Sequence, residues 1–301
     1  MLKQRIITAL LLLAILLPAL FARQTQWFMG VALVLMTLAA WEWGLLNGFS
    51  KKASWLVGLA CVLMCALAWA LALPYRATPA LWVLLGSAWV LVGALLLKAG
   101  VAGWSKIPRW LRITGGLLGL SGAWLAIVQA RVIGINFLLS VLLLVWAADV
   151  FAYFAGRALG RRKLAPAISP GKSWEGVWGG MVGVLVLAAC WVWADKAAQA
   201  EVVSIYSHIY LYTYQGGWLL LVLAALFMSC MSVVGDLIES LVKRAAGAKD
   251  SSNLLPGHGG VLDRVDALLP TLPLAMMLLS DRKSTRLNSS HRNTSRMPSS
   301  A

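Results

Sequence analysis

Long apolar runs recur along almost the whole chain, and short polar segments separate them. A helix needs about 20 apolar residues to cross a hydrocarbon layer of about 30 Å, so a run of this length predicts a transmembrane helix. The runs cover residues 6–21, 27–46, 53–73, 80–97, 111–130, 135–154, 176–194 and 216–238, and a shorter ninth run covers 266–280. We therefore predict an all-α, polytopic integral membrane protein with about nine transmembrane helices, the last of them truncated.

The two ends of the chain need separate treatment. Residues 281–301 are rich in Ser, Arg and Asn and have no apolar period, so we expect a non-native or disordered tail there and exclude it from the functional argument. The first apolar run follows Lys3 and Arg5, but no Ala-x-Ala cleavage motif comes after it, which favours a retained membrane anchor over a signal peptide. The remaining chain is divided into N-terminal transmembrane helices, 1–133, and a transmembrane region with cytoplasmic loops, 134–280, which holds the candidate catalytic residues.

The composition and the charge distribution agree with a membrane location. Of the 301 residues, 60% are hydrophobic and 12% are charged, and the mean hydropathy is +0.80. The net charge is +15. Among the Lys and Arg residues before residue 281, only four lie on the opposite side of the membrane from the others in the predicted topology: Arg23, Arg76, Arg131 and Lys196. Because basic loops stay in the cytoplasm, we expect a bacterial inner-membrane protein whose basic loops face the cytoplasm. No soluble domain carries a basic stripe, so nucleic-acid binding is not indicated.

Asp149 is an ionisable residue near the cytoplasmic end of the sixth run, in the segment WAADVFAYFAGRALGRRK. Tyr153 lies four residues further on and therefore on the same helix face, and Arg157 follows one turn later. An ionisable group in a transmembrane helix is energetically costly, so it is a functional candidate by default. The alternative is a carboxylate that Arg157 or a neighbouring helix simply neutralises.

The loop SPGKSWEG leads into the seventh apolar run and could bind an anion. Ser169, Ser173 and the backbone amides near a helix start are hydrogen-bond donors, and Lys172 adds a point charge suited to phosphate. A helix-capping loop with a lysine that reaches toward the interface would have the same sequence, so this loop alone leaves both interpretations open.

The most informative stretch of the chain is residues 235–266, GDLIESLVKRAAGAKDSSNLLPGHGGVLDRVD. Asp236, Glu239, Ser240 and Lys243 follow helical offsets, so one face of the eighth helix carries all four. That face is polar inside the membrane, where polar side chains cost free energy and apolar side chains would not. We expect it to line a functional site.

A loop rich in Gly and Ser follows this helix and contains Lys249, Asp250 and His258. Gly259 and Gly260 come next, and glycines allow backbone amides to approach a ligand closely and to bind anions. The simpler interpretation is a juxtamembrane loop whose charges pair with each other and face water.

Asp263, Arg264 and Asp266 end the stretch, and the two aspartates share a helix face. Carboxylates beside basic residues suit Mg²⁺, which is usually held by one or two carboxylates together with substrate phosphates and water. Zinc is disfavoured because His258 has no neighbouring histidine or cysteine, and a lone histidine is more often an ordinary loop residue.

At these residues the sequence resembles the phosphatidate cytidylyltransferases, or CDP-diacylglycerol synthases. The SPGKSWEG loop, the Asp149 segment and the AAWEWG run at residues 39–44 are also similar to that family, so the resemblance covers most of residues 1–280. The long signature is matched at Ser240, Val242, Lys243, Arg244, Lys249, Asp250, Ser252, Leu255, Pro256, His258, Gly259, Gly260, Val261, Asp263, Arg264, Val265 and Asp266.

The resemblance implies a reaction in phospholipid biosynthesis, in which a phosphatidate phosphate attacks the α-phosphorus of CTP to give CDP-diacylglycerol and pyrophosphate. It implies that Asp236 and Asp263 hold Mg²⁺, with a monovalent cation such as K⁺ beside it, and that these two residues, Lys243 and Asp149 are catalytic. The expected substrate-binding residues are Ser169, Lys172, Ser173, Ser240, Arg244, Lys249, Asp250, His258, Gly259, Gly260, Arg264 and Asp266. The resemblance also implies a homodimer with a cavity open to the cytoplasm.

Two other functions compete with this interpretation. An ion-coupled secondary transporter would explain Asp149 and Asp236 at membrane depth, but it predicts two related halves with interrupted helices, and no internal repeat is seen. A CDP-alcohol phosphotransferase would handle related lipids, but its pattern of spaced aspartates on one helix pair is missing.

Overall fold

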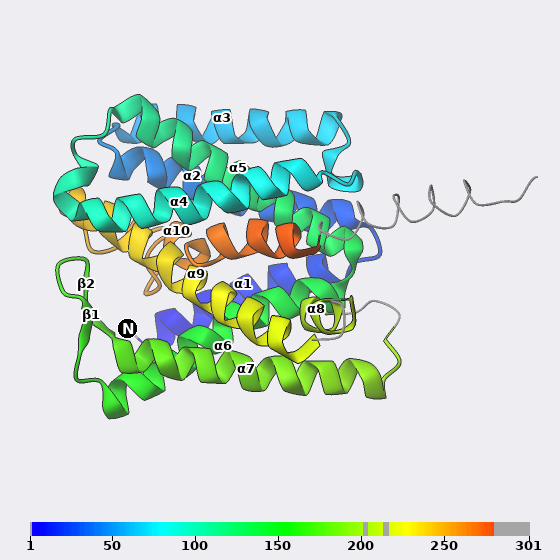
Figure 1. Ribbon diagram of the computed structural model, residues 1–301. Coiled ribbons are helices and arrows are strands. Elements are labelled where there is room, and N and C mark those ends of the chain that lie inside the picture. Colours follow the sequence, from blue (N-terminus) through cyan, green and yellow to red (C-terminus); the bar gives the residue numbers. More distant parts are fainter. Residues whose placement is uncertain (1, 201–203, 213–216, 280–301) are drawn as a thin grey trace, which may run out of the picture.

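The computed structural model describes residues 2–200, 204–212 and 217–279 and is almost entirely helical (Figure 1). The elements in chain order are α1 (Leu2–Phe21), α2 (Thr25–Leu46), α3 (Lys51–Ala70), the 3₁₀ turn η1 (Leu73–Tyr75), α4 (Pro79–Trp104), α5 (Arg109–Ile133), α6 (Ile135–Leu159), β1 (Lys163–Ala165), β2 (Ser169–Ser173), α7 (Trp174–Ala197), α8 (Ile205–Tyr212), α9 (Gly217–Ala245) and α10 (Leu262–Val265).

Seven of the described helices are long and apolar enough to cross a membrane, namely α2, α3, α4, α5, α6, α7 and α9. This confirms a polytopic helical membrane protein but not the expected count of nine. The apolar part of α1, Ile6–Phe21, is shorter than a full span. Residues 268–279 are helical, but they end where the described chain ends, and the tail 281–301 lies outside the described residues.

The spanning helices pack into one bundle. Helices α2, α3, α4 and α5 lie on one side of Figure 1, α6 and α7 lie on the other, and α9 crosses between α4 and α7. The contacts of α4 with α9 and of α2 with α10 join the predicted parts 1–133 and 134–280, whose division stays a prediction.

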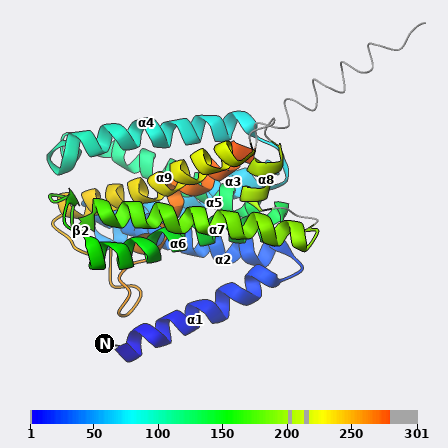
Figure 2. The ribbon, with the colours of Figure 1, turned by 60° about the horizontal axis from the view of Figure 1, so that its bottom comes forward.

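Helix α1 lies at the edge of this bundle and is inclined to the other helices, as Figure 2 shows. It packs against α2. Polar contacts tie it at two points: Thr8 Oγ1 donates to the Pro256 carbonyl (3.0 Å), and Arg131 Nε donates to the Leu20 carbonyl (2.8 Å).

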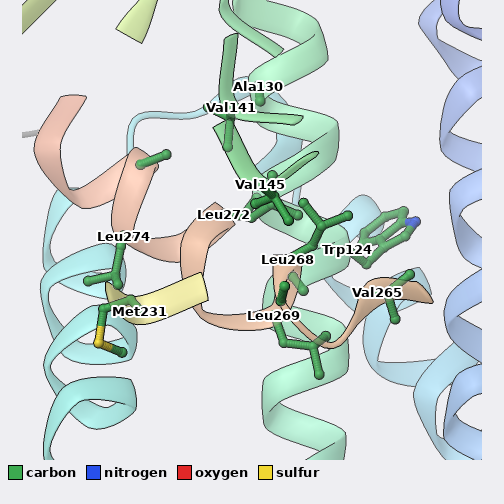
Figure 3. Packing of buried hydrophobic residues seen from close by; sticks show 14 of the residues in the cluster. Trp124, Ala130, Val141, Val145, Met231, Val265, Leu268, Leu269, Leu272 and Leu274 are labelled. Carbon is green, nitrogen blue, oxygen red and sulfur yellow. The ribbon is translucent and has the colours of Figure 1, made fainter. Parts of the chain in front are cut away.

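The segment after α10 lies in the centre of the bundle. Leu268, Leu272 and Leu274 are buried and pack with Val145 and Met231 from α6 and α9 (Figure 3). Because this buried segment directly follows the 250–266 stretch, it anchors one end of that stretch in the core.

A short antiparallel hairpin, β1 with β2, was not expected from the sequence. The segment LAPAISPGKS contains Pro166 and Pro170, which are uncommon inside strands, and therefore has the pattern of a loop. The hairpin lies at the end of the bundle opposite to α8 (Figure 1). It delivers the predicted SPGKSWEG residues to the start of α7.

Candidate active site

The β1–β2 hairpin is fixed to the first turn of α7. Ser173 is the N-cap of α7, and its hydroxyl accepts a hydrogen bond from the Gly176 amide (3.2 Å). The Glu175 carboxylate accepts hydrogen bonds from the backbone amides of Arg161 (3.1 Å) and Arg162 (3.2 Å). These contacts hold the base of the hairpin and set the position of Lys172.

Lys172 and Asp236 form the first charged pair of the site. The Lys172 ammonium contacts Asp236 Oδ2, and both side chains are roughly three-quarters buried. Ser240, one turn further along α9, donates from its hydroxyl to Asp236 Oδ1 (3.3 Å). The predicted polar face of α9 therefore meets the predicted anion-binding loop.

A cavity of about 380 Å³ opens beside this pair. Its polar lining includes Asp149, Tyr153, Arg157, Lys172, Ser173 and Asp236. Arg157 donates to the Tyr153 hydroxyl (3.1 Å), a contact that does not test the alternative interpretation of Asp149 as a carboxylate neutralised by Arg157 or by a neighbouring helix. Ser169 does not line this cavity and lies at the other end of β2, paired in register with Ala165.

Lys243 is the centre of a second charged cluster. Its ammonium lies 2.5 Å from Glu239 Oε2 and 2.6 Å from Asp263 Oδ1. The side chains of Lys243, Glu239 and Asp263 are 13%, 3% and 9% exposed. One ammonium therefore faces two carboxylates in a nearly closed space.

Asp263 receives further hydrogen bonds from the glycine-rich loop. The Gly260 amide (2.7 Å), the Ser251 amide (3.0 Å) and the Ser251 hydroxyl (2.9 Å) all donate to its Oδ2. Burial raises the pKa of the Asp263 carboxyl, but its hydrogen bonds with Glu239 and Lys243, together with those from the loop, hold that pKa well below its ordinary value. Asp263 is therefore ionised at neutral pH.

Asp266 connects the two clusters. Burial and the charge of Asp236 in the first cluster raise the pKa of the Asp266 carboxyl, while Lys172 in the first cluster and Lys243 in the second lower it. Asp149 lines the same cavity as Asp236. The structure thus brings all four predicted catalytic residues into two neighbouring clusters.

The remaining predicted binding residues lie in or around the loop after α9. Arg244, Lys249 and Asp250 are exposed, and Arg244 donates from Nε to the Ile168 carbonyl (3.3 Å) beside the hairpin. Arg264 donates from Nε to the His258 carbonyl (3.1 Å). These contacts shape the loop and leave the Lys249 side chain at its surface.

Gly259 and Gly260 have the conformations that the sequence predicted for close backbone approach. Gly259 has a φ of +80°, which favours glycine. A Cβ atom on Gly260 would overlap Ser251 Oγ and Glu42 Oε1.

Glu42 and Glu239 are site residues that the sequence interpretation did not select. Glu239 was placed on the polar face of α9 without a role, and Glu42 was noted only as part of AAWEWG. Both are buried carboxylates in membrane helices, and the exposed fraction is 0% for Glu42 and 3% for Glu239. The rule that an intramembrane ionisable residue is a functional candidate would have selected both.

The carboxylates can complete a metal site only together with other ligands. In residues 2–200, 204–212 and 217–279, no three His, Cys, Asp or Glu side chains form a group that could hold a metal. Asp236 and Asp263 each contact a lysine ammonium instead. Magnesium commonly takes one or two carboxylates plus substrate phosphates and water, so this donor set fits Mg²⁺ when phosphate oxygens supply the rest.

Comparison with known proteins identifies the family. Residues 3–280 match the sequence profile of the cytidylyltransferase family. The chain belongs to this family. Both charged clusters of this cytidylyltransferase-family member lie within the matched residues 3–280.

Its relatives include bacterial enzymes. The chain is 41% identical over 283 residues to a phosphatidate cytidylyltransferase of Pseudomonas aeruginosa, covering 93% of this chain and 97% of the relative. It is 36% identical over 293 residues to the phosphatidate cytidylyltransferase of Haemophilus influenzae, covering 91% and 96%. A third relative, from Bacillus subtilis, is 41% identical over 147 residues, covering 49% and 48%.

Proposed function

We propose that this chain transfers a cytidylyl group from CTP to phosphatidate. An oxygen of the phosphatidate phosphate bonds to the α-phosphorus of CTP, and the bond from that phosphorus to the β-phosphate oxygen breaks. The products are CDP-diacylglycerol and pyrophosphate. The match to relatives that are named phosphatidate cytidylyltransferase over more than nine-tenths of the chain carries this proposal.

The two lysine–carboxylate clusters support such chemistry. A phosphate nucleophile is already anionic, so the protein mainly has to align two polyanions and neutralise their charge. Lys172 and Lys243 are held beside carboxylates, and each can turn its ammonium toward a phosphate when the substrates arrive. Arg244, Lys249 and Arg264 extend the positive charge along the exposed loop.

We propose that Asp236 and Asp263 hold Mg²⁺ together with the substrate phosphates, and that a monovalent cation such as K⁺ lies beside it. When bound, Mg²⁺ would neutralise phosphate charge. One observation supports a cation at these carboxylates: each already attracts a lysine ammonium.

We also propose that the site faces the cytoplasm of a bacterial cell and that two copies form a homodimer. The orientation is supported by the basic residues at the hairpin end of the bundle, such as Arg161, Arg162 and Lys163. The dimer rests on the family resemblance, and crosslinking in native membranes tests it.

A direct assay tests the proposed reaction. Membranes that contain the full chain are incubated with labelled CTP, phosphatidate and Mg²⁺, and the lipid products are separated. We expect CDP-diacylglycerol and pyrophosphate in equal amounts, and the activity should disappear when Mg²⁺ is chelated and return when it is restored. Formation of no CDP-diacylglycerol by a correctly inserted chain contradicts the proposal.

A further inference from the structure

Glu42 is a fully buried carboxylate in α2, far along the chain from the signature region. Its exposed fraction is 0%, although it belongs to a predominantly apolar helix. A buried carboxylate is costly unless several donors satisfy it. The donors that surround Glu42 therefore indicate what it does.

All four of these donors come from the loop that follows α9. Val261 N donates to Glu42 Oε1 (3.0 Å), and Leu262 N donates to Oε2 (2.6 Å). The hydroxyl of Ser252 donates to Oε1 (2.5 Å), and the hydroxyl of Ser251, whose single hydrogen Asp263 can also accept, lies 3.1 Å from Oε2. Both carboxylate oxygens are thus satisfied by a segment more than 200 positions away along the chain.

Glu42 and Asp263 share the same short run of donors. The amide of Gly260 donates to Asp263, and the next two amides, of Val261 and Leu262, donate to Glu42. The Ser251 hydroxyl lies within hydrogen-bond distance of both carboxylates, 3.1 Å from Glu42 and 2.9 Å from Asp263. The loop is therefore held between the two side chains.

The close approach also explains why Gly260 must lack a side chain. A Cβ there would overlap Glu42 Oε1 and Ser251 Oγ. Glu42 thus acts as an internal anion around which residues 251–262 fold, much as a carboxylate caps the first amides of a helix.

We propose that Glu42 is a positioning residue for cytidylyl transfer, one that fixes the 251–262 loop so that Asp263 and the Gly259–Gly260 backbone are held in their reactive arrangement. This inference rests on the proposed function. Glu42 reaches the reacting groups only through Ser251 and the loop amides, and its own oxygens are fully occupied by protein donors.

The test compares Glu42→Gln with a matched control, Asp195→Asn. Asp195 is also a buried carboxylate, and it accepts from Ser204 N (2.9 Å), Ser204 Oγ (2.6 Å) and Asn136 Nδ2 (2.8 Å) near the end of α7 that is remote from the hairpin. Both substitutions replace a carboxylate by a carboxamide of nearly equal size. Both should lower the thermal stability of the purified chain.

The two variants should differ in turnover. We expect Glu42→Gln to lower kcat by about 10- to 100-fold, the loss typical when a group that orients ligands is changed, with a smaller change in KM for CTP. Asp195→Asn should keep kcat per folded molecule within about 2-fold, because the two sites are far apart. Glu42→Asp, which keeps the charge but is shorter, should recover part of the lost kcat. Equal kcat values for Glu42→Gln and Asp195→Asn would overturn the inference.

Hydrogen exchange supplies a readout that does not need turnover. In Glu42→Gln, the amides of Ser251, Gly260, Val261 and Leu262 should exchange faster than in the unsubstituted chain, while Asp195→Asn should leave them protected. Unchanged protection in Glu42→Gln contradicts the positioning role even if the unsubstituted chain makes no CDP-diacylglycerol.

If Glu42→Gln does not fold, Ser252→Ala supplies a second test, because it removes a single donor to Glu42. Unchanged loop protection and unchanged kcat in Ser252→Ala would also overturn the inference.

Discussion

At the scale of single residues, the site is built from lysines that neutralise carboxylates. Lys172 contacts Asp236, and Lys243 contacts Glu239 and Asp263. Such pairs keep each charge from being buried alone, which would be strongly destabilising. The same lysines supply positive charge that can neutralise two polyanionic substrates.

Lys172 gives the first prediction. Lys172→Gln removes the ammonium that lines the cavity but keeps a polar chain, so kcat/KM should fall about 10²- to 10³-fold, the loss seen when a donor to a developing charge is removed. Steady-state rates with CTP and phosphatidate measure the effect. Lys163→Gln is the control, because Lys163 is exposed, belongs to the same hairpin and does not line the cavity. Equal losses in both variants would mean that only the net charge of the hairpin matters.

Asp263 gives the second prediction. Asp263→Asn presents an amide group to the donors of Gly260 and Ser251 and removes a charge from Lys243, so turnover should fall by at least about 10²-fold. The variant should still be found inserted in the membrane fraction. Near-normal turnover would remove Asp263 from the proposed metal ligands.

The depressed pKa of Asp263 gives a third prediction, about stability. A carboxyl whose pKa is lower in the folded than in the unfolded chain stabilises the fold above its unfolded pKa of about 3.9, and this contribution is lost as the pH falls through the folded value. Asp263→Asn should therefore lower the melting temperature at pH 7, and the difference from the unsubstituted chain should shrink below about pH 4. A difference that grows on acidification contradicts the assigned pKa direction.

The sequence predicts much of this residue-scale chemistry but not its pairing. The helical offsets of Asp236, Glu239, Ser240 and Lys243 place them on one face, and the structure has them there. The role of Glu42 could not be read from its neighbours, because AAWEWG has the pattern of an apolar helix and its partners lie in a loop that is remote in the chain.

At the scale of elements, glycines decide how closely α6 and α7 pack. A Cβ on Gly180 would lie 2.7 Å from the Ala148 carbonyl oxygen, so the helices can approach only because Gly180 has no side chain. Asp149 lies on α6 beside this contact, and Lys172 precedes α7. The width of the cavity therefore depends on this helix pair.

Gly180→Val tests that dependence. The added side chain should push α6 from α7, lower the thermal stability by about 1–3 kcal/mol and reduce turnover. Thermal unfolding in detergent and the lipid-product assay measure both effects. The control is Gly115→Val, because Gly115 is also helical but a Cβ there meets nothing within 4 Å. A Gly180→Val variant that behaves like Gly115→Val would show that the close helix contact is not needed.

Element boundaries show what hydropathy can and cannot predict. Length and apolarity identify seven spanning helices among the described residues, because each must satisfy its own backbone in lipid. The β1–β2 hairpin is fixed by contacts that hydropathy does not describe, such as the Glu175 carboxylate with the Arg161 and Arg162 amides. Pro166 and Pro170 also argue against a strand at the level of sequence, because proline is uncommon inside strands.

At the scale of the whole molecule, the site forms where segments distant in sequence meet at one end of the bundle. The hairpin, the end of α9 and the 251–262 loop come together there, while α8 lies at the opposite end (Figure 1). The buried segment with Leu268 and Leu272 anchors the loop from the core side (Figure 3). Which helices become neighbours depends on packing across the chain, so the sequence pattern alone cannot predict it.

This arrangement allows the proposed orientation to be tested with two cysteines. Ala167 in the hairpin and Ala198 at the end of α7 are both exposed and lie at opposite ends of α7. If the basic hairpin is cytoplasmic, Ala167→Cys should react with a membrane-impermeant maleimide only in inside-out vesicles, and Ala198→Cys only in intact spheroplasts. The unsubstituted chain measures the background from its own cysteines, of which Cys61 and Cys65 are buried. The reverse labelling pattern would place Lys172 and Asp236 on the face away from cytoplasmic CTP, and the proposed reaction would then lack its nucleotide.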